Sequence, residues 1–270
     1  MPELPEVETI VRGLEAAVVG RRILAVQVLL PKMALAPVGV QFAPALVGER
    51  IVGSRRRGKY AVLLLASGRR LVTSLRMTGR LIVGDEGDAP YPATHVSLRL
   101  EGGLRLSFAD VRTFGRMRLV EPTEAWDAAL GLEPLSRDFT PERFTAMLSG
   151  RTTPVKVFLL DQRRLVGIGN IYACEALWGA RIRPSRPGKA LTSPAIRRLR
   201  DAVVDVLARA IELRGTSIDD YVDADGLAGG FQNRLSVYGR AGEPCSRCER
   251  PIVRTVIAQR GTWWCRTCQR

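Results

Sequence analysis

The sequence predicts an α+β protein of several domains: a β-sandwich preceded by an N-terminal helix, then a helical domain, then a small zinc-bound β-hairpin. Three observations predict it: short apolar runs separated by turn residues fill residues 22–120, helical periodicity replaces them after Pro122, and four cysteines fall within the last 26 residues. With 270 residues, 46% of them hydrophobic, the chain is typical of a folded, soluble protein with room for more than one core.

The N-terminal part is expected to open with a helix over residues 6–17, because Val7, Ile10, Val11 and Leu14 recur on one face. Eight short apolar segments follow, and their number and spacing predict a β-sandwich or barrel. Residues 96–109 predict a hairpin that turns at Glu101-Gly102-Gly103. The eight segments are RILAVQVLL, ERIVGSRRR, YAVLLL, RRLVTSLRM, GRLIV, HVSLRL, LRLSF and GRMRLV.

The second part is expected to be helical at 123–130, 141–149, 154–162, 170–179 and 193–213, the last helix starting from a Thr192/Ser193-Pro194 cap. Residues 131–137 predict a linker. Residues 214–234 are rich in glycine and aspartate and predict a long loop, which is typically functional or disordered. We therefore expect three domains, at 1–130, 131–236 and 237–270.

The charge favours a polyanionic partner. Forty-one Lys+Arg stand against 27 Asp+Glu, a net charge of +14 and a pI of about 10.5. Each phosphate that such a protein neutralises releases a condensed counterion, and arginine, which dominates here, binds phosphates and bases in a bidentate manner. A GC-rich genome combined with ordinary solubility charge explains the same composition, so charge by itself favours nucleic acid without establishing it.

The sequence also indicates a location. It contains no run of about 18 apolar residues, the length that predicts a membrane-spanning helix. The N-terminus, MPELPEVETI, carries acids where a signal peptide has a basic region followed by an apolar stretch. We therefore expect a cytoplasmic protein.

The C-terminal cysteines predict one structural Zn²⁺. Cys245 and Cys248 form one C-x-x-C pair, and Cys265 and Cys268 form a second pair 16 residues later. Four thiolates close a tetrahedral site, and so small a segment needs the metal in order to fold. A redox dithiol is the alternative, disfavoured because there are two pairs. Cys174, alone in an apolar stretch, is expected to fill the core.

The residues between the two cysteine pairs predict a β-hairpin, IVRTVIAQ followed by TWW, with its turn at Arg260-Gly261. Arg260 at that tip would present its guanidinium group to a phosphate. A solvated turn arginine is the alternative interpretation.

The N-terminus offers a nucleophile. Removal of Met1 would leave Pro2 with a secondary amine whose pKa lies near about 8, so that much of it is unprotonated near neutral pH. Such an amine can attack a sugar C1′ and form an iminium, with Glu3 and Glu6 close enough to move protons. The alternative is an ordinary acidic helix start, favoured by the helix dipole.

These motifs occur together in one known family. The chain closely resembles the formamidopyrimidine-DNA glycosylases, bifunctional bacterial enzymes that remove 8-oxoguanine and formamidopyrimidines and then act as AP lyases. The resemblance runs nearly end to end. Its motifs are PELPEVETIVRGL, RRRGKY, LRMTGRL, FADVRTFGRM, PVKVFLLDQRRLVGIGNIYACEALW, VYGRAGEPC and the four cysteines.

The resemblance implies a role for each residue of the chemistry. Pro2 matches the nucleophile that displaces the damaged base and forms the Schiff base. Glu3 matches the acid that assists opening of the sugar ring, and Glu6 supports the amine. Lys59 matches the lysine of β-elimination and phosphate contact, and Arg260 matches the zinc-hairpin arginine that grips phosphates and serves δ-elimination.

The resemblance also implies how DNA is held. GIGNIYACEALW matches a helix–two-turn–helix element, in which Asn170 starts a helix that can bind a phosphate. Because a base inside a duplex cannot be attacked, the enzyme everts it and fills the void. Met77, Arg112 and Phe114 match the residues that fill this void. Further DNA contacts are implied for His95, Arg151 and Lys156.

Four positions depart from the usual family pattern. Ser74 and Arg76 stand where HLGMTG has His and Gly, and Val111 and Thr113 alter DPRRFG, so that its second arginine is lost. These departures leave the nucleophile intact and affect the fine DNA contacts. The loop after Arg214, which covers the everted base in the family, is the least matched region.

We therefore expect a monomeric glycosylase and AP lyase with one structural zinc, acting on oxidised purines in duplex DNA through a Pro2 Schiff base and β,δ-elimination. An endonuclease VIII-like enzyme for oxidised pyrimidines is the close alternative, but it typically opens PEGPE, and Leu4 argues against it. A non-catalytic zinc-containing DNA-binding protein is the third interpretation, and retention of Met1 would favour it because the nucleophile would then be blocked.

Overall fold

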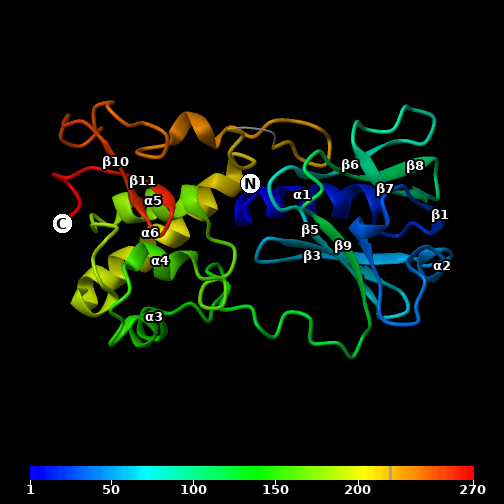
Figure 1. The fold of residues 1–270 in the computed structure, drawn as a ribbon, viewed down its shortest axis with the longest axis horizontal. Helices are drawn as coiled ribbons and strands as arrows, with labels where there is room; N and C mark the ends of the chain where they lie inside the picture. The colour runs from blue at the N-terminus through cyan, green and yellow to red at the C-terminus, as the bar shows by residue number, and fades with distance from the viewer. Residues whose placement is uncertain (219–220) are drawn as a thin grey trace. The chain divides into compact units, whose positions relative to one another are not determined.

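Internal contacts divide the computed structural model, which describes residues 1–218 and 221–270, into two compact units (Figure 1). The first unit is Met1–Ala128 with Leu213–Gly230, and the second is Ala129–Glu212 with Phe231–Arg270. The zinc hairpin counts with the second unit. The three predicted domains are a finer division than these units, and they stay a prediction.

The first unit contains two β-sheets. One sheet has the order β1-β7-β8-β6 and the other has the order β2-β9-β5-β4-β3. All eight predicted strands are present, and the sequence missed the two-residue β2, which pairs in parallel with β9. The strands are β1 (Ile23–Val28), β2 (Ala34–Leu35), β3 (Ile51–Arg57), β4 (Tyr60–Leu65), β5 (Arg70–Ser74), β6 (Gly79–Asp85), β7 (Thr94–Leu100), β8 (Leu104–Asp110) and β9 (Arg116–Val120).

One core joins these sheets to the N-terminal helix α1 (Leu4–Val18). Val7, Ile10 and Leu14 of α1 are fully or almost fully buried, as their helical spacing predicts. The helix starts two residues earlier than expected because Glu3 occupies the N-cap and Pro5 fits the first turn. The short helix α2 (Phe42–Leu46) packs against the same core.

The predicted hairpin of β7 and β8 is confirmed. Leu100 pairs with Leu104 across the turn, where Gly102 and Gly103 both have positive φ, at +85° and +73°. A glycine pair adopts this backbone without steric cost, so the turn fixes the register of both strands.

The helix expected at 123–130 is wrong. These residues, all described, form turns that cross the outer face of the five-stranded sheet, where the Trp126 and Tyr60 rings meet edge to face at 5.4 Å. Arg70 Nη2 donates to the carbonyls of Glu121 at 2.7 Å and Glu124 at 2.9 Å. The bond to Glu124 therefore takes a carbonyl that a helix over these residues would use for itself.

The second unit confirms the other four predicted helices. They are α3 (Pro141–Leu148), α4 (Val155–Leu160), α5 (Asn170–Gly179) and α6 (Ser193–Glu212). Thr140 caps α3 by accepting the Arg143 N–H at 3.2 Å. Residues 131–137 contain neither helix nor strand, but they belong wholly to the second unit, where Leu132 forms a β-bridge with Leu165. Two short 3₁₀ turns, Gly188–Ala190 and Phe231–Arg234, complete the helical part.

The C-terminal hairpin is formed by β10 (Val253–Ile257) and β11 (Arg260–Trp264). Its turn is Ala258-Gln259, both left-handed with φ of +46° and +60°, so the predicted turn at Arg260-Gly261 is wrong by two residues. Two left-handed residues suit a two-residue hairpin because their twist matches the strands. Arg260 consequently pairs with Ile257 as the first residue of β11.

The long loop predicted at 214–234 contains no helix or strand in its described part up to Gly230, and residues 219–220 lie outside the described residues. The buried Asp223 carboxylate organises it. It accepts the N–H groups of Asp225 and Leu227 at 3.0 Å and the Arg214 Nε–H at 2.9 Å. Among the helices that the structure describes, none is long and apolar enough to cross a membrane.

Candidate functional site

The start of α1 places three predicted residues together in a buried setting. Pro2 is buried, and Glu3 and Glu6 are only 2% and 1% exposed. The Glu6 carboxylate accepts the Glu3 N–H at 2.7 Å and the Thr216 N–H at 2.8 Å, and so joins the helix start to the loop that follows α6. Gly215 is required between them, because a Cβ there would lie 2.8 Å from Glu6 Oε1.

Tyr221 closes this arrangement from the same loop. Its hydroxyl group lies 3.3 Å from the carbonyl of Glu6 and 3.2 Å from the carbonyl of Arg214, and donates to them. Burial, followed by the charge of Glu6, raises the pKa of Tyr221 well above its usual value. The hydroxyl group therefore stays protonated as a donor, and it fixes the backbone just after Pro2 and Glu3.

Lys59 lies in the two-residue turn between β3 and β4, where Arg57 pairs with Tyr60. Helix α1 runs antiparallel to β3, since Glu8 bonds to Arg56 at 2.9 Å while Glu15, two helical turns later, accepts the Ser54 N–H at 2.8 Å. The turn that carries Lys59 therefore lies toward the N-terminal end of α1.

Two neighbouring loops of the first unit carry the residues expected to fill the void. Met77 lies between β5 and β6, and Arg112 and Phe114 lie between β8 and β9. The loops meet directly, because Arg112 Nη1 lies 3.3 Å from the sulfur of Met77. Met77 is 44% exposed and Phe114 is 56% exposed, so both side chains lie outside the core.

The Asp110 carboxylate holds both loops in place, and sequence reasoning missed this residue. This carboxylate, 1% exposed, accepts the Thr78 hydroxyl, the Arg112 N–H at 3.2 Å and the Gly115 N–H at 2.7 Å. Its backbone carbonyl lies 3.0 Å from His95 Nε2. The available signal was an aspartate followed by a glycine-containing loop, which is too common to identify the residue.

The departures from the family pattern fall on these loops. Arg76 and Thr113 both have left-handed backbones, with φ of +55° and +54°, a conformation uncommon for residues other than glycine. Thr113 accepts a hydrogen bond from Lys32 at 2.8 Å, and Val111 is 74% exposed. Ser74 is buried at the end of β5.

In the second unit, Lys156 and Asn170 converge on the zinc hairpin. Lys156 is fully buried, and its Nζ donates to the carbonyl of Gly261 at 2.9 Å and to Thr262 Oγ1 at 2.7 Å. Asn170 Nδ2 donates to the same carbonyl at 3.0 Å. These bonds fix the backbone next to Arg260.

The segment between α4 and α5 contains a hydrogen-bonded turn at 162–164 and a bend at 166–167. Gln162 holds them by donating to the carbonyls of Leu160 at 3.0 Å and Ile168 at 2.8 Å, and by accepting the Gly167 N–H at 2.8 Å. The segment delivers Asn170 at the first residue of α5, the positive end of the helix dipole, which in general favours anions.

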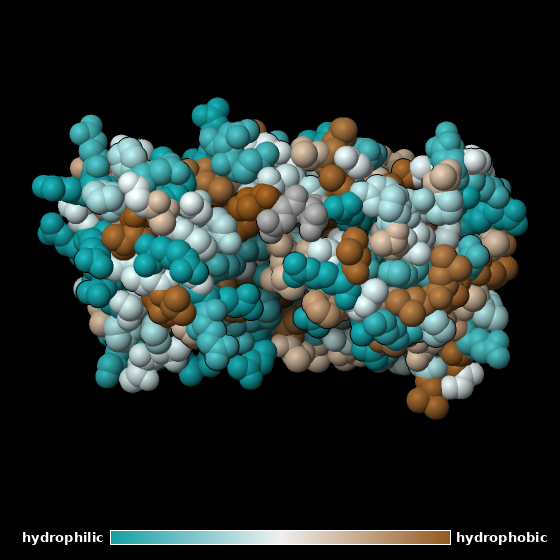
Figure 2. All heavy atoms as spheres, turned by 45° about the horizontal axis from the view of Figure 1, so that its top comes forward, coloured by the Kyte–Doolittle hydropathy of each residue, from teal (hydrophilic) through white to brown (hydrophobic). Residues whose placement is uncertain are grey.

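Positive charge concentrates in the second unit. It contains 22 Lys+Arg and 10 Asp+Glu, a net charge of +12 out of the chain's +14. Arg151 and Arg260 are both exposed. Figure 2 shows hydrophilic side chains over most of the face it presents, with apolar ones in separate groups. A surface so biased attracts a polyanion.

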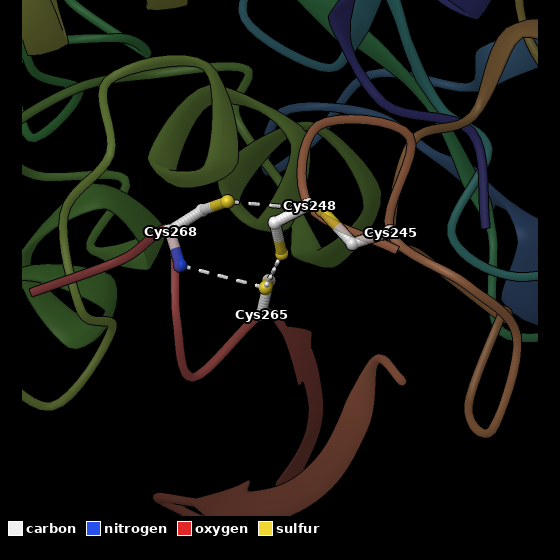
Figure 3. A group of neighbouring side chains, drawn as sticks. All are labelled: Cys245, Cys248, Cys265 and Cys268. Atoms are coloured by element: carbon white, nitrogen blue, oxygen red, sulfur yellow. Dashed lines mark hydrogen bonds between the residues drawn. The ribbon is translucent and has the colours of Figure 1, made fainter. Parts of the chain in front are cut away.

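The four predicted zinc ligands lie together with their sulfur atoms pointing at one another (Figure 3). All four sulfurs lie within 4.8 Å, with Cys245 and Cys268 at 3.9 Å and Cys248 and Cys265 at 3.5 Å. A tetrahedron with Zn–S bonds of about 2.3 Å has sulfurs about 3.8 Å apart. The cluster therefore fits one structural zinc and is too open for disulfides.

The surroundings of the cluster act on its thiols in opposite directions, and burial raises the pKa of both Cys265 and Cys268. Burial raises the pKa of the Cys245 thiol, but hydrogen bonds, first that from the Arg247 N–H, outweigh burial and lower it to about 6. Gln269, 1% exposed, accepts the Cys265 N–H at 2.8 Å and donates to the carbonyl of Ile182 at 2.9 Å. Cys174 is buried beside the cluster, as expected of a core cysteine.

Glu175 of α5 anchors the segment that leads into the zinc finger. Its carboxylate accepts three consecutive N–H groups, from Ser236, Val237 and Tyr238, at 2.8–2.9 Å. Burial raises the pKa of Glu175, and the three donors act in the opposite direction. Sequence reasoning missed this residue because an acid inside an apolar helix has no local signal for its partners.

A β-sandwich with a buried acidic N-terminus, a helix–two-turn–helix element and a four-cysteine hairpin together define a zinc-finger DNA-processing protein. The family models agree over most of the chain. Residues 1–117 match the formamidopyrimidine-DNA glycosylase N-terminal domain, 130–222 match its H2TH domain, and 242–270 match the zinc finger found in FPG and IleRS. The chain belongs to the formamidopyrimidine-DNA glycosylase family.

Individual relatives agree over their full length. The chain is 44% identical to the formamidopyrimidine-DNA glycosylase of Pelotomaculum thermopropionicum, covering 100% of this chain and 99% of that protein. It is 46% identical to that of Chloroflexus aggregans, covering 100% and 98%. The MutM (Fpg) protein of Thermus thermophilus superposes with a TM-score of 0.89 at 43% identity, covering 99% and 98%.

A DNA complex is among the similar structures. Wild-type Lactococcus lactis Fpg (MutM), bound to DNA containing N7-benzyl-Fapy-dG, has a TM-score of 0.92 at 36% identity and covers 99% of both chains. The resemblance predicted from the motifs is therefore confirmed at the level of the family and the fold.

Proposed function

We propose that this chain is a base-excision repair enzyme, a bifunctional DNA glycosylase and AP lyase that removes oxidised purines, such as 8-oxoguanine and formamidopyrimidines, from duplex DNA. One observation carries the proposal. Pro2, Glu3 and Glu6 lie buried together at the start of α1, in a chain whose relatives are formamidopyrimidine-DNA glycosylases over their whole length.

Pro2 supplies the nucleophile in this proposal. Once Met1 is removed, the Pro2 nitrogen attacks C1′ of the damaged nucleotide, the glycosidic bond breaks, and the base leaves with the bonding electrons and takes up a proton. Glu3 protonates O4′ as the sugar ring opens, which leaves an iminium between Pro2 and C1′. The bonds from Glu6 to the Glu3 and Thr216 N–H groups hold the helix start in place for this attack.

Two eliminations then cleave the strand. In the first, C2′ loses a proton and the 3′ phosphate departs, and we assign Lys59 to this step and to contact with the phosphate. In the second, C4′ loses a proton and the 5′ phosphate departs, and we assign Arg260. Cations beside the departing oxygens stabilise the charge that develops there.

The remaining predicted residues hold the DNA. We assign Met77 and Phe114 to the void left by the everted base and Arg112 to the orphaned partner base, because the two loops meet and expose these side chains. For phosphate contacts we assign His95, Arg151 and Asn170. The DNA contact expected of Lys156 gives way to a positioning role, because its ammonium group is fully buried and bonded to the hairpin backbone next to Arg260. The hairpin that presents Arg260 is held by the zinc site, whose metal supplies folding energy when bound.

The same proposal covers organisation and location. We propose that residues 1–130 form the catalytic domain, 131–236 the helix–two-turn–helix domain and 237–270 the zinc finger, and that the protein acts as a monomer. Because its substrate is chromosomal DNA, we place it in the cytoplasm, bound to the nucleoid.

Borohydride trapping tests the function. The processed protein, mixed with an 8-oxoguanine:C duplex and borohydride, is expected to form a stable crosslink, because the iminium is reducible. A matched variant with an N-terminal extension, in which the Pro2 nitrogen is an amide, is expected to form none while keeping Lys59. Equal crosslinking of both proteins would assign the nucleophile to a lysine. Absence of crosslinks on every oxidised-base duplex would favour a non-catalytic DNA-binding protein.

A further inference from the structure

Helix α1 packs along the edge strand of the five-stranded sheet. Strand β3 is the last strand of that sheet, so one side of its backbone has no neighbouring strand. Polar side chains of α1 meet that edge: Glu15 accepts the Ser54 N–H at 2.8 Å, and the Ser54 hydroxyl donates to the carbonyl of Val11 at 3.1 Å. These contacts fix the position of α1 along the length of β3.

Glu8 of α1 also contacts β3, and through Arg56 this contact extends to the turn that follows the strand. Its carboxylate binds Arg56 Nε at 2.9 Å, and both side chains are largely buried, at 23% and 10% exposure. Arg56 Nη1 then donates to the carbonyl of Gly58 at 3.2 Å. One guanidinium group therefore joins α1 directly to the turn that carries Lys59.

The distances along the chain explain why this connection matters. From Glu8 to the first residue of α1 the helix rises about 6 Å, and from Arg56 to the Gly58-Lys59 turn the chain advances by up to roughly 7 Å in the same direction. The helix start, with Pro2 and Glu3, and the Lys59 turn thus both lie on the same side of the Glu8–Arg56 pair, which ties the two elements together just behind them. Gly58, with φ of +57°, gives the turn the left-handed backbone it needs but no side chain to anchor it.

We propose that Glu8 and Arg56 are positioning residues that hold Lys59 in register with the N-terminus of α1, and so serve the elimination that follows Schiff-base formation. The inference rests on the proposed function, because it takes Pro2 and Lys59 as the groups to be aligned. Arg12, the other partner of Glu8 at 3.0 Å, is 64% exposed and orients the Glu8 carboxylate from the solvent side.

The proposal predicts a selective defect. Glu8→Ala removes the carboxylate that binds Arg56 Nε and so weakens the link from α1 to the Gly58 carbonyl, while the Glu6 contacts that hold Pro2 and Glu3 remain. Since small misplacements of a reacting group cost on the order of tenfold or more in rate, strand cleavage of a preformed abasic-site duplex is expected to fall about tenfold. Borohydride trapping on the same duplex is expected to stay within about twofold of wild type. Arg56→Lys, which keeps the charge opposite Glu8 but not the second donor to Gly58, is expected to fall between Glu8→Ala and wild type.

Glu15→Ala is the matched control, because it removes a carboxylate from the same helix and the same strand edge, two turns further from Lys59. It is expected to lower the melting temperature without changing the ratio of cleavage to trapping. A Glu8→Ala variant whose cleavage and trapping fall together, or whose cleavage equals wild type, would overturn the proposal. Lys59→Ala, measured in parallel, separates the two failures. If Lys59→Ala cleaves at the wild-type rate, the Lys59 assignment is wrong and the inference fails with it. If Lys59→Ala cleaves slowly while Glu8→Ala cleaves normally, only the inference is wrong.

Discussion

Replacing Lys156 with methionine removes two hydrogen bonds that hold the zinc hairpin and keeps most of the side-chain volume. The ammonium group is fully buried and donates to the Gly261 carbonyl at 2.9 Å and to Thr262 Oγ1 at 2.7 Å. Hydrogen bonds from a charged donor contribute about 1.5–3 kcal/mol each. Two losses would give about 3–6 kcal/mol, but two effects reduce this sum.

Asn170 still donates to the Gly261 carbonyl at 3.0 Å, so that acceptor is not left unpartnered. Removing a buried cation also removes its desolvation cost. We therefore expect the packing of the hairpin against α4 to weaken by about 2–3 kcal/mol. At about 1.4 kcal/mol per factor of ten, the equilibrium between the packed and the displaced hairpin changes about 30- to 150-fold. Because Arg260 begins the strand at this point, the ratio of δ- to β-elimination product should fall with it.

The assay resolves the products of an abasic-site duplex on a denaturing gel, for Lys156→Met, Arg260→Ala and the double variant. If Lys156 acts by placing Arg260, the double variant performs no less δ-elimination than Arg260→Ala. Multiplicative effects of the two substitutions would refute this reasoning. A drop of about one unit in the salt dependence of DNA binding for Lys156→Met would then assign Lys156 to a direct phosphate contact.

Three further outcomes are expected. Cys248→Ser should lose zinc and duplex affinity together, measured by metal content and fluorescence anisotropy, since the metal folds the hairpin; tight binding by demetallated protein would contradict this. Wild-type protein should excise 8-oxoguanine faster opposite C than opposite A, and Arg112→Ala should reduce that difference, worth about 1–3 kcal/mol for a bidentate contact; equal wild-type rates would exclude the role. Glu175→Gln should lower the free energy of unfolding by about 1–3 kcal/mol, because an amide leaves one of the three N–H groups at 236–238 without an acceptor. An unchanged denaturation midpoint would show that the contact contributes little.

The sequence predicts well where local rules and tertiary needs agree. The apolar face of helix α1 predicts that helix, and the bounds predicted for α5, 170–179, agree with the structure to the residue. Two consecutive glycines predict the turn between β7 and β8. In each case the same residues satisfy the local backbone preference and the core. The four cysteines are equally local within each pair, because C-x-x-C spacing already brings two thiolates to one ion.

The errors fall where distant residues decide. The expected helix at 123–130 gives way because Arg70, about fifty residues earlier, takes the carbonyl of Glu124, and because Trp126 covers the sheet. The hairpin turn moved by two residues, since Ala258 and Gln259 accept left-handed backbones that glycine usually supplies. Gly261, the obvious turn residue, is instead a strand position whose carbonyl is held by Lys156.

By itself, the sequence determined the family, the zinc ligands and the type of each reacting group, because these depend on residue identity and on spacing along the chain. Only the tertiary structure decided how those groups are held. The Glu6 carboxylate bonds to an N–H 210 residues away, Lys156 is buried against the hairpin, and Asp110 joins two loops from different strands. Such contacts leave no periodic signal, because a buried polar group is satisfied by whichever chain segment the fold brings within hydrogen-bonding distance.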